Sequence, residues 1–367
     1  MASKITLCST PASLGLAVSA LSTQAVILVN CEAQDLGLPG CVLSILSLSD
    51  PLAEHIFLVD VLAFPSSPTH CASSTAPPPI PRPHPALAPV LALLSLPHIT
   101  KVFFDGRAGV LELLLAYGLV LANVLDLQLV EAAARVQKSK LSLSRIEPHL
   151  LKHSFKTIAA EVERNPSAYA GIYAVRCLEH VVGFFKLASF ANKPKDPAFV
   201  AMRRACGSAV WLARPLPEPL QTSAAYHITL IALVYAHFMD RQRVVEHMQT
   251  LRAQSAVYLG LLSSREENAR LKELKILRFL PLGIIDRDAD NDVHESAPRY
   301  GCGCCRRDLT LDCYVMRLQS TDTSESDEGQ RVGDVRQAQE RERLSYCRLC
   351  NAVAQRNGRT LGKWLVC

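Results

Sequence analysis

The residues best placed for chemistry are cysteines near the end of the chain. The 367-residue sequence has 13 cysteines, and seven of them lie in its last seventy positions. Four form two pairs, Cys302-x-x-Cys305 and Cys347-x-x-Cys350. In each pair two thiolates can approach one ion, and two pairs complete the tetrahedral sulfur set of a structural zinc ion. The spacing therefore predicts a zinc site made by these four cysteines.

Other interpretations of this region stay open at the level of sequence. Cys304 and Cys313 are alternative ligands, and a tail with incidental thiols is the simpler interpretation. Clustered cysteines without a convincing secretory signal favour a reducing compartment and metal binding over disulfides. Several arginines that flank the pairs could contact phosphates: Arg306, Arg307, Arg348, Arg356 and Arg359.

Five short apolar runs predict the strands of a sheet. The first three follow each other closely, at Ala25–Val29, Val42–Leu48 and Ile56–Leu62. Two more lie at Thr100–Phe104 and Val120–Leu125. Runs of Val, Ile and Leu of this length, bounded by turn residues, are typical of strands. We therefore expect five strands, and helices between and after the last two.

The rest of the chain divides by composition. From about Asp126 to Arg278 the pattern is almost wholly helical, with breaks at prolines, which predicts a mixed sheet with helices packed on its faces. Residues 65–97 are dense in Pro, Ser and Thr and predict an inserted loop. The composition changes near Pro281, which predicts a domain at 1–280 and a cysteine-rich extension at 281–367.

The net charge and the hydropathy pattern limit which binding partners and which cellular locations are compatible with the sequence. A net charge of +5 is compatible with nucleic acid without requiring it. The apolar stretch Leu14–Val29 is interrupted by polar residues, which argues against a signal peptide. The apolar run Gly109–Val130 contains Glu112 and Asp126, which favours buried α/β structure over a membrane span. We expect an intracellular protein, nuclear or cytoplasmic, with no membrane partner; a protein partner stays open.

Three groups of segments, in order along the chain, together form a motif pattern. They are VILVNCE at 26–32, KVFFDGR at 101–107 with VLDLQL at 124–129, and RPLPE at 214–218 with AAY at 224–226. Their order, spacing and expected strand or helix setting resemble the ribonuclease-D-type 3′–5′ exonucleases of the DEDD group. The resemblance covers residues 24–131 and 211–238 well. It implies a ribonuclease-H-like fold: a mixed five-stranded sheet flanked by helices, here followed by the cysteine-rich extension.

The resemblance also implies a catalytic site, which this chain has largely lost. Such exonucleases hold two Mg²⁺ or Mn²⁺ ions with four carboxylates. Glu32 survives, but Asn30, Gly109 and His227 stand where the other three carboxylates are expected. Ser223 replaces the tyrosine whose hydroxyl would orient the attacking water. An amide offers one neutral oxygen and glycine offers no side chain, so we predict weak or no nuclease activity.

Nearby carboxylates could substitute for the missing ones. Asp105 and Asp126 lie close to the second motif, although the simpler interpretation is that each caps the following helix. Arg107 is a candidate phosphate contact by resemblance. His227 could bind a softer metal, but a lone helical histidine is more often packed or solvated.

Three functions remain to be compared. The first is an exonuclease-like domain that binds RNA or DNA without cleaving it, or that recruits a partner through the former active-site groove. The second is an active metal-dependent 3′–5′ exonuclease that uses substitute carboxylates. The third is a structural module for protein contacts. Metal dependence distinguishes the second function, and salt-sensitive binding of oligonucleotides distinguishes the first from the third.

Overall fold

The computed structural model divides the chain into two compact units. The first consists of residues 1–139 and 175–273, and the second of residues 140–174 and 274–367. The domain boundary expected near Pro281 stays a prediction. The residues that the structure describes are 3–65, 83–138, 154–187, 196–285, 298–318, 341–359 and 362–367.

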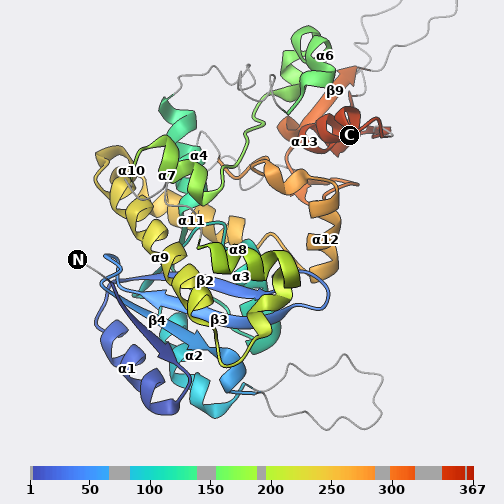
Figure 1. Ribbon diagram of the computed structural model, residues 1–367. Coiled ribbons are helices and arrows are strands. Elements are labelled where there is room, and N and C mark those ends of the chain that lie inside the picture. The colour runs from blue at the N-terminus through green and yellow to red at the C-terminus, as the bar shows by residue number, and fades with distance from the viewer. Residues whose placement is uncertain are drawn as a thin grey trace, which may run out of the picture. The chain divides into compact units, whose positions relative to one another are not determined.

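A six-stranded mixed sheet forms the centre of the first unit (Figure 1). The strand order is β1-β4-β3-β2-β5-β6. β2, β3 and β4 are antiparallel neighbours, whereas β5 and β6 run parallel to β2 and β1 runs parallel to β4. The bounds are β1 Lys4–Cys8, β2 Val26–Gln34, β3 Val42–Ser49, β4 His55–Asp60, β5 Thr100–Phe103 and β6 Val124–Asp126.

The predicted ribonuclease-H-like fold class is confirmed by this sheet, with one addition. Strands β2 to β6 are the five expected from the sequence, and three antiparallel strands followed by two parallel ones is the ribonuclease-H-like arrangement. The sixth strand, β1, extends the sheet beyond β4. It has only five residues, with a half-exposed face, which is too weak a pattern to indicate a strand from sequence.

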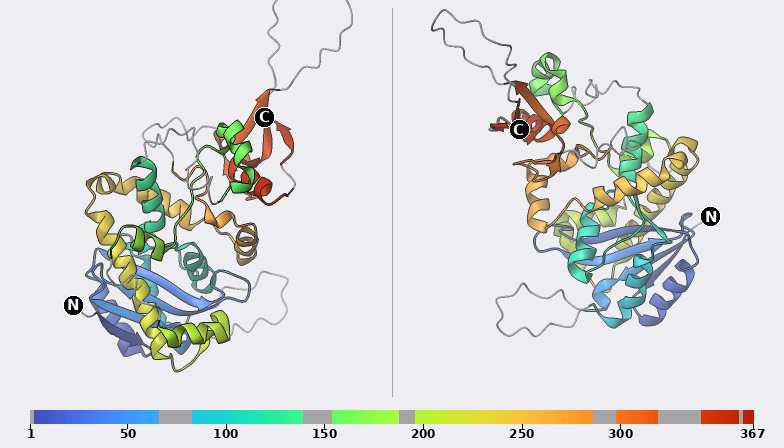
Figure 2. Two further views of the ribbon diagram at one scale, coloured as in Figure 1. Left: turned by 45° about the horizontal axis from the view of Figure 1, so that its top comes forward. Right: turned by 180° about the vertical axis from the view of Figure 1, so that it is seen from behind.

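Helices cover both faces of the sheet. Along β2, Val29 and Cys31 join a core with Leu14 of α1 and Leu94 of α2. On the other face, α9 runs across β2, β3 and β4 (Figures 1 and 2). The helices of this unit are α1 Pro11–Leu21, α2 Ala88–Ser95, α3 Arg107–Tyr117, α4 Leu127–Lys138, α7 Leu178–Phe184, α8 Pro197–Cys206, α9 Glu218–Met239, α10 Gln242–Glu246, α11 Met248–Leu259 and α12 Arg265–Glu273.

The structure shows what two segments with ambiguous sequence patterns form, the apolar run at 109–130 and the predicted insertion at 65–97. Glu112 is 1 % exposed on α3 and pairs with Arg265 at 2.7 Å, so the run that contains it is buried structure, as expected. In the described part of the chain, no helix is long and apolar enough to cross a membrane. The predicted insertion at 65–97 ends earlier than expected, because α2 buries Val90 and Leu94; residues 66–82 lie outside the described residues.

The second unit contains short strands and one amphipathic helix. Two hairpin strands, β7 and β8, precede the antiparallel sheet β11-β10-β9, and helix α13 follows β10 directly. Phe155 and Phe279 stack at 5.4 Å between ring centroids. The elements are η3 Lys156–Ile158, α6 Ala159–Arg164, η4 Pro166–Tyr169, η6 Ile276–Arg278, β7 Tyr300–Gly301, β8 Asp308–Leu309, η8 Leu311–Cys313, β9 Tyr314–Leu318, β10 Arg341–Cys347, α13 Arg348–Arg356 and β11 Trp364–Val366.

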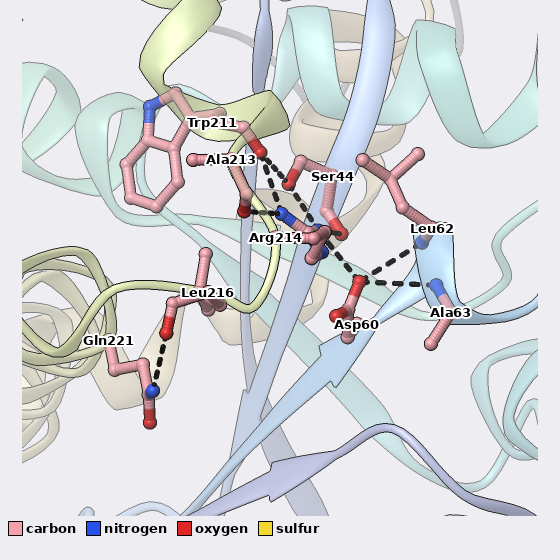
Figure 3. A network of polar contacts seen from close by, with 9 residues as sticks. All are labelled: Ser44, Asp60, Leu62, Ala63, Trp211, Ala213, Arg214, Leu216 and Gln221. Carbon is pink, nitrogen blue, oxygen red and sulfur yellow. Dashed lines mark hydrogen bonds and ion pairs between the residues drawn. The ribbon is translucent and has the colours of Figure 1, made fainter.

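Arg214 attaches the start of α9 to the sheet (Figure 3). Its Nη2 donates to Asp60 Oδ1 at 2.6 Å and to Ser44 Oγ at 2.9 Å. Its Nη1 donates to the carbonyl oxygens of Trp211 and Ala213. Asp60 is 3 % exposed, and a buried carboxylate is costly unless it is paired. Because α9 begins four residues after Arg214, this network determines where α9 starts over the sheet.

We predict that Arg214→Met lowers the free energy of unfolding of the first unit by about 3 kcal/mol, because it leaves a buried carboxylate without its cation. Urea unfolding followed by tryptophan fluorescence measures the loss. Arg204→Met, at an exposed position of α8, is the matched control and should change the value by less than about 0.5 kcal/mol. Equal effects of the two substitutions would contradict a structural role for the network.

Candidate functional site

Glu32 and His227 form a hydrogen-bonded pair although 195 positions separate them in sequence. His227 Nδ1 lies 2.7 Å from Glu32 Oε1, and a carboxylate can only accept there. Asn30 Nδ2 donates to the same oxygen at 3.1 Å. Alternation along β2 places Asn30 and Glu32 on one face, toward α9. The surviving carboxylate is thus already bound by an amide and an imidazole.

The pair lines a cavity of about 420 Å³ in the first unit. Ser223, one helical turn before His227 on α9, lines it as well. The structure therefore brings together Asn30, Glu32, Ser223 and His227, at three of the four degenerate motif positions and the surviving glutamate. The lining residues are Glu32, Glu179, Asp196, Phe199, Arg203, Trp211, Pro219, Thr222, Ser223, Tyr226 and His227.

Several lining residues were missed from the sequence. Glu179 lies in the first turn of α7, and Asp196 caps α8 by accepting from the N–H of Ala198 at 2.8 Å. No motif marks either residue. Trp211 and Tyr226 had a usable signal, since Trp211 stands three residues before Arg214 and Tyr226 precedes His227 directly. The rings of Phe199 and Trp211 are 6.4 Å apart, which gives the cavity an aromatic wall.

A side chain at position 109 would point toward Cys31, on the face of β2 opposite to Glu32. A Cβ built on Gly109 would lie 3.1 Å from Cys31 Sγ and 3.3 Å from Cys31 Cβ. Cys31 is 6 % exposed and belongs to the core on the α1 side of β2. An aspartate side chain at position 109 would therefore crowd a buried sulfur.

Asp105, Arg107 and Asp126 form a separate network that does not line the cavity. Arg107 is 3 % exposed; it pairs with Asp105 at 2.7 Å, and its guanidinium lies 4.7 Å from the ring centroid of Tyr258. This geometry favours a structural role for Arg107 over contact with phosphate, which stays a prediction. Asp105 does not cap α3, because Gly106 is the N-cap residue and no side chain caps this helix.

Asp126 has the capping role expected from the sequence. Its carboxylate accepts from the N–H groups of Asp105, Gly106 and Gln128, at 3.2, 2.8 and 2.8 Å. Burial raises the pKa of Asp126 to about 6, and the charge of Asp105 adds to this rise, whereas the three N–H donors oppose it. Three of its roughly four acceptor sites serve the backbone, which leaves little for a metal.

A two-metal centre does not fit these residues. Hard divalent ions need several converging anionic oxygens. Glu32 is the carboxylate that Asn30 and His227 contact. Within the described residues, three or more side chains that could ligate a metal converge at one place only, and that place is built from cysteines. These residues therefore lack the donor set that Mg²⁺ or Mn²⁺ would need.

The two predicted cysteine pairs meet in the second unit. The sulfurs of Cys302, Cys305, Cys347 and Cys350 all lie within 4.8 Å of one another, and all four residues are buried. The first pair lies in the turn between β7 and β8, and the second spans the start of α13. The N–H of Cys347 donates to the Cys302 sulfur at 3.2 Å. Four buried sulfurs at this separation fit the tetrahedral coordination of structural zinc.

Comparison with known proteins finds a likeness of fold. No family model and no curated protein matches the chain. Trypanosoma brucei RNase D is 18 % identical over 71 % of this chain and 73 % of that one, with a TM-score of 0.49. Escherichia coli RNase D is 16 % identical over 75 % and 54 %, with a TM-score of 0.40. The Aedes aegypti Nibbler EXO domain is 14 % identical over 70 % and 95 %, with a TM-score of 0.40.

We predict that Gly109→Asp destabilises the first unit by about 2 kcal/mol or more, because it forces a carboxylate against a buried sulfur. Urea unfolding measures the change. Gly15→Asp is the matched control, since Gly15 lies on α1 with open space around its Cβ. Cys31→Ala should recover part of the loss in the double variant. A fully stable Gly109→Asp variant would show that position 109 faces free space.

We predict that the purified chain contains one zinc ion per molecule, and that Cys350→Ser removes it. Such sites contribute on the order of 10 kcal/mol to folding, so chelation should make the second unit sensitive to protease while the first unit survives. Elemental analysis and limited proteolysis give the two readouts. Cys313→Ser, at a buried cysteine outside the cluster, should keep the zinc. Zinc loss in Cys313→Ser with retention in Cys350→Ser would refute this ligand set.

Proposed function

We propose that this chain is a 3′–5′ exonuclease-like protein that binds nucleic acid and has weak or no metal-dependent nuclease activity. The observation that carries the proposal is the engagement of Glu32 by His227 at 2.7 Å and by Asn30 at 3.1 Å. Both hydrogen bonds are accepted by Oε1 of Glu32. An imidazole and an amide add no negative charge to the site.

The second hypothesis, an active enzyme with substitute carboxylates, has less support. Asp126 uses its oxygens to cap the backbone, and Asp105 is paired with Arg107. Two-metal catalysis tolerates little misplacement of its ligands. A role for either aspartate would require both of these networks to rearrange.

The cavity suits the end of a single strand. Its aromatic wall of Phe199 and Trp211 offers faces on which a base could stack, and Arg203 offers a cation for phosphate. Stacking and phosphate contacts are the usual components of single-strand binding. We propose single-stranded RNA or DNA as the ligand and an intracellular location, nuclear or cytoplasmic, with the cysteine cluster as a structural zinc site.

The test uses a 5′-labelled single-stranded oligonucleotide, incubated with Mg²⁺ or Mn²⁺ and, separately, bound without added metal. We expect no shortening of the strand. We also expect binding that is independent of Mg²⁺ apart from its ionic strength and that weakens as salt rises. Glu32→Ala serves as the control for trace contaminating nuclease, which the substitution cannot affect.

Two outcomes would contradict the proposal. Metal-dependent shortening that disappears in Glu32→Ala would establish an active site completed by other carboxylates. A wild-type chain that neither shortens nor binds oligonucleotides, while its fold and zinc are intact, would favour a structural module for protein contacts.

A further inference from the structure

Aromatic rings gather in the first unit where α7 packs against the end of α9. The rings of Phe184 and Phe185, at the end of α7, lie 5.0 Å apart, and the ring of Phe185 lies 4.5 Å from that of His237 on α9. The ring of His180 stacks with Phe184 at 6.5 Å, with 17° between the ring planes. We call these four rings, together with Arg241, the α7–α9 aromatic surface.

Packing of the two helices explains only part of this surface. Phe185 is half-buried, and its ring meets that of the fully buried Phe238 at 5.7 Å, so it holds α7 against α9. Phe184, in contrast, is 59 % exposed, and His180 beside it is exposed as well. A single exposed apolar side chain is ordinary, whereas a stacked group of exposed rings is typical of a binding surface.

Two guanidinium groups lie against these rings. Arg176 is 4.5 Å from the ring centroid of Phe184, and Arg241 is 5.2 Å from that of Phe185. Arg176 is paired with the buried Glu131 at 2.9 Å. Arg241 forms no ion pair with a carboxylate in the part of the chain that the structure describes. Its charge is therefore available to an anion that comes to the rings.

The hydrogen-bond partner of Arg241 is a neutral ring. Arg241 Nη2 lies 2.8 Å from His237 Nε2. Burial lowers the pKa of His237, and the charge of Arg241 lowers it further, whereas the charge of Asp240 opposes the fall. The imidazole is therefore uncharged near pH 7, and its nitrogen accepts from the guanidinium. A cation held beside exposed rings suits a ligand that has both negative charge and flat aromatic groups.

The aromatic surface shares both of its helices with the cavity. Glu179, in the first turn of α7, and Tyr226, on α9, line the cavity. Phe184 lies about 7.5 Å of helix beyond Glu179, and His237 lies about 16 Å of helix beyond Tyr226. Figure 1 shows α7 beside the end of α9 that leads into α10. A strand held in the cavity is thus within a few nucleotides of the surface.

We infer that the α7–α9 aromatic surface is a stacking site for the bases of a single-stranded nucleic acid, with Arg241 as a contact for its phosphates. The inference rests on the proposed function for the class of ligand and adds where the strand lies outside the cavity. Every base has an aromatic face and every linkage has a negative charge, so rings beside a guanidinium bind a strand without reading its sequence. A protein partner is less suited, because the exposed neighbours of Phe184 include His180 and Lys186 and form no continuous apolar patch.

The experiment measures the affinity of the full, zinc-loaded chain for a labelled oligouridylate, about 20 residues long, by fluorescence anisotropy at several salt concentrations. We expect Phe184→Leu, which keeps an apolar side chain but removes the ring, to bind about fivefold more weakly or worse, because a stacked base is lost. Its slope of log K against log salt should stay unchanged. Arg241→Met should instead reduce the steepness of that slope by about one, because one phosphate contact is lost.

Leu16→Ala and Lys272→Met are the matched controls. Leu16 is 64 % exposed on α1, across the sheet from α9, and Lys272 is exposed on α12. These changes remove exposed apolar surface and a positive charge away from α7, and each should change the affinity by less than about twofold. Phe184→Trp should keep the affinity, and its added fluorescence over the wild type should fall on binding as a base stacks on the indole. Circular dichroism checks that each variant is folded.

The outcomes separate this inference from the proposed function. If Phe199→Ala in the cavity weakens binding while Phe184→Leu and Arg241→Met keep the wild-type affinity and salt slope, the aromatic surface is refuted and the proposed function stands. If Phe184→Leu weakens binding and Phe199→Ala does not, the inference stands and the strand does not end in the cavity. If the wild-type chain binds no oligonucleotide, both fail, and a dimer that Phe184→Asp converts into a monomer would assign the surface to a second copy of the chain.

Discussion

The alternation of side chains between the two faces of β2 determines which of its residues join the core of the first unit and which lie at the cavity. Side chains of a strand point to opposite faces in turn, so Asn30 and Glu32 face α9 while Cys31 faces α1 and α2. On one face the carboxylate of Glu32 is bound by His227. On the other, the sulfur of Cys31 fills the space beside Gly109. His227 and Gly109, two positions where the motif pattern predicts carboxylates, therefore lie next to residues on opposite faces of β2.

Among the described residues, the region around Glu32 does not bring four carboxylates together at one point. Four carboxylates close together repel one another when no cation is bound, so such a site costs stability. Here Glu32 accepts hydrogen bonds from an amide and an imidazole, and Glu179 and Asp196 line the same cavity without forming a metal-ligating cluster with it among the described residues. The network of Arg214, Asp60 and Ser44 still positions α9 over the sheet (Figure 3). The sheet and α9 therefore keep a ribonuclease-H-like arrangement around Glu32.

Much of the fold followed from local patterns, and the failures have physical causes. Five apolar runs indicated five strands, but β1 was missed because its pairing with β4 is a long-range contact that a five-residue pattern does not reveal. Asp126 caps its helix as expected, whereas Gly106 takes the cap position that Asp105 was expected to fill. The meeting of the four cysteines followed from their spacing. Glu179 and Asp196 line the cavity because of how α7 and α8 pack, and no sequence motif encodes that packing.

The central claim is that Glu32 is held in a hydrogen-bonded group that no longer binds divalent ions. Binding of Mn²⁺ to the zinc-loaded full chain, followed by electron paramagnetic resonance, tests it most directly. We predict no site that fills below about millimolar Mn²⁺, because one carboxylate with an amide and an imidazole lacks the charge that hard ions need. One or two ions bound at micromolar Mn²⁺, and lost in Glu32→Ala, would contradict the account.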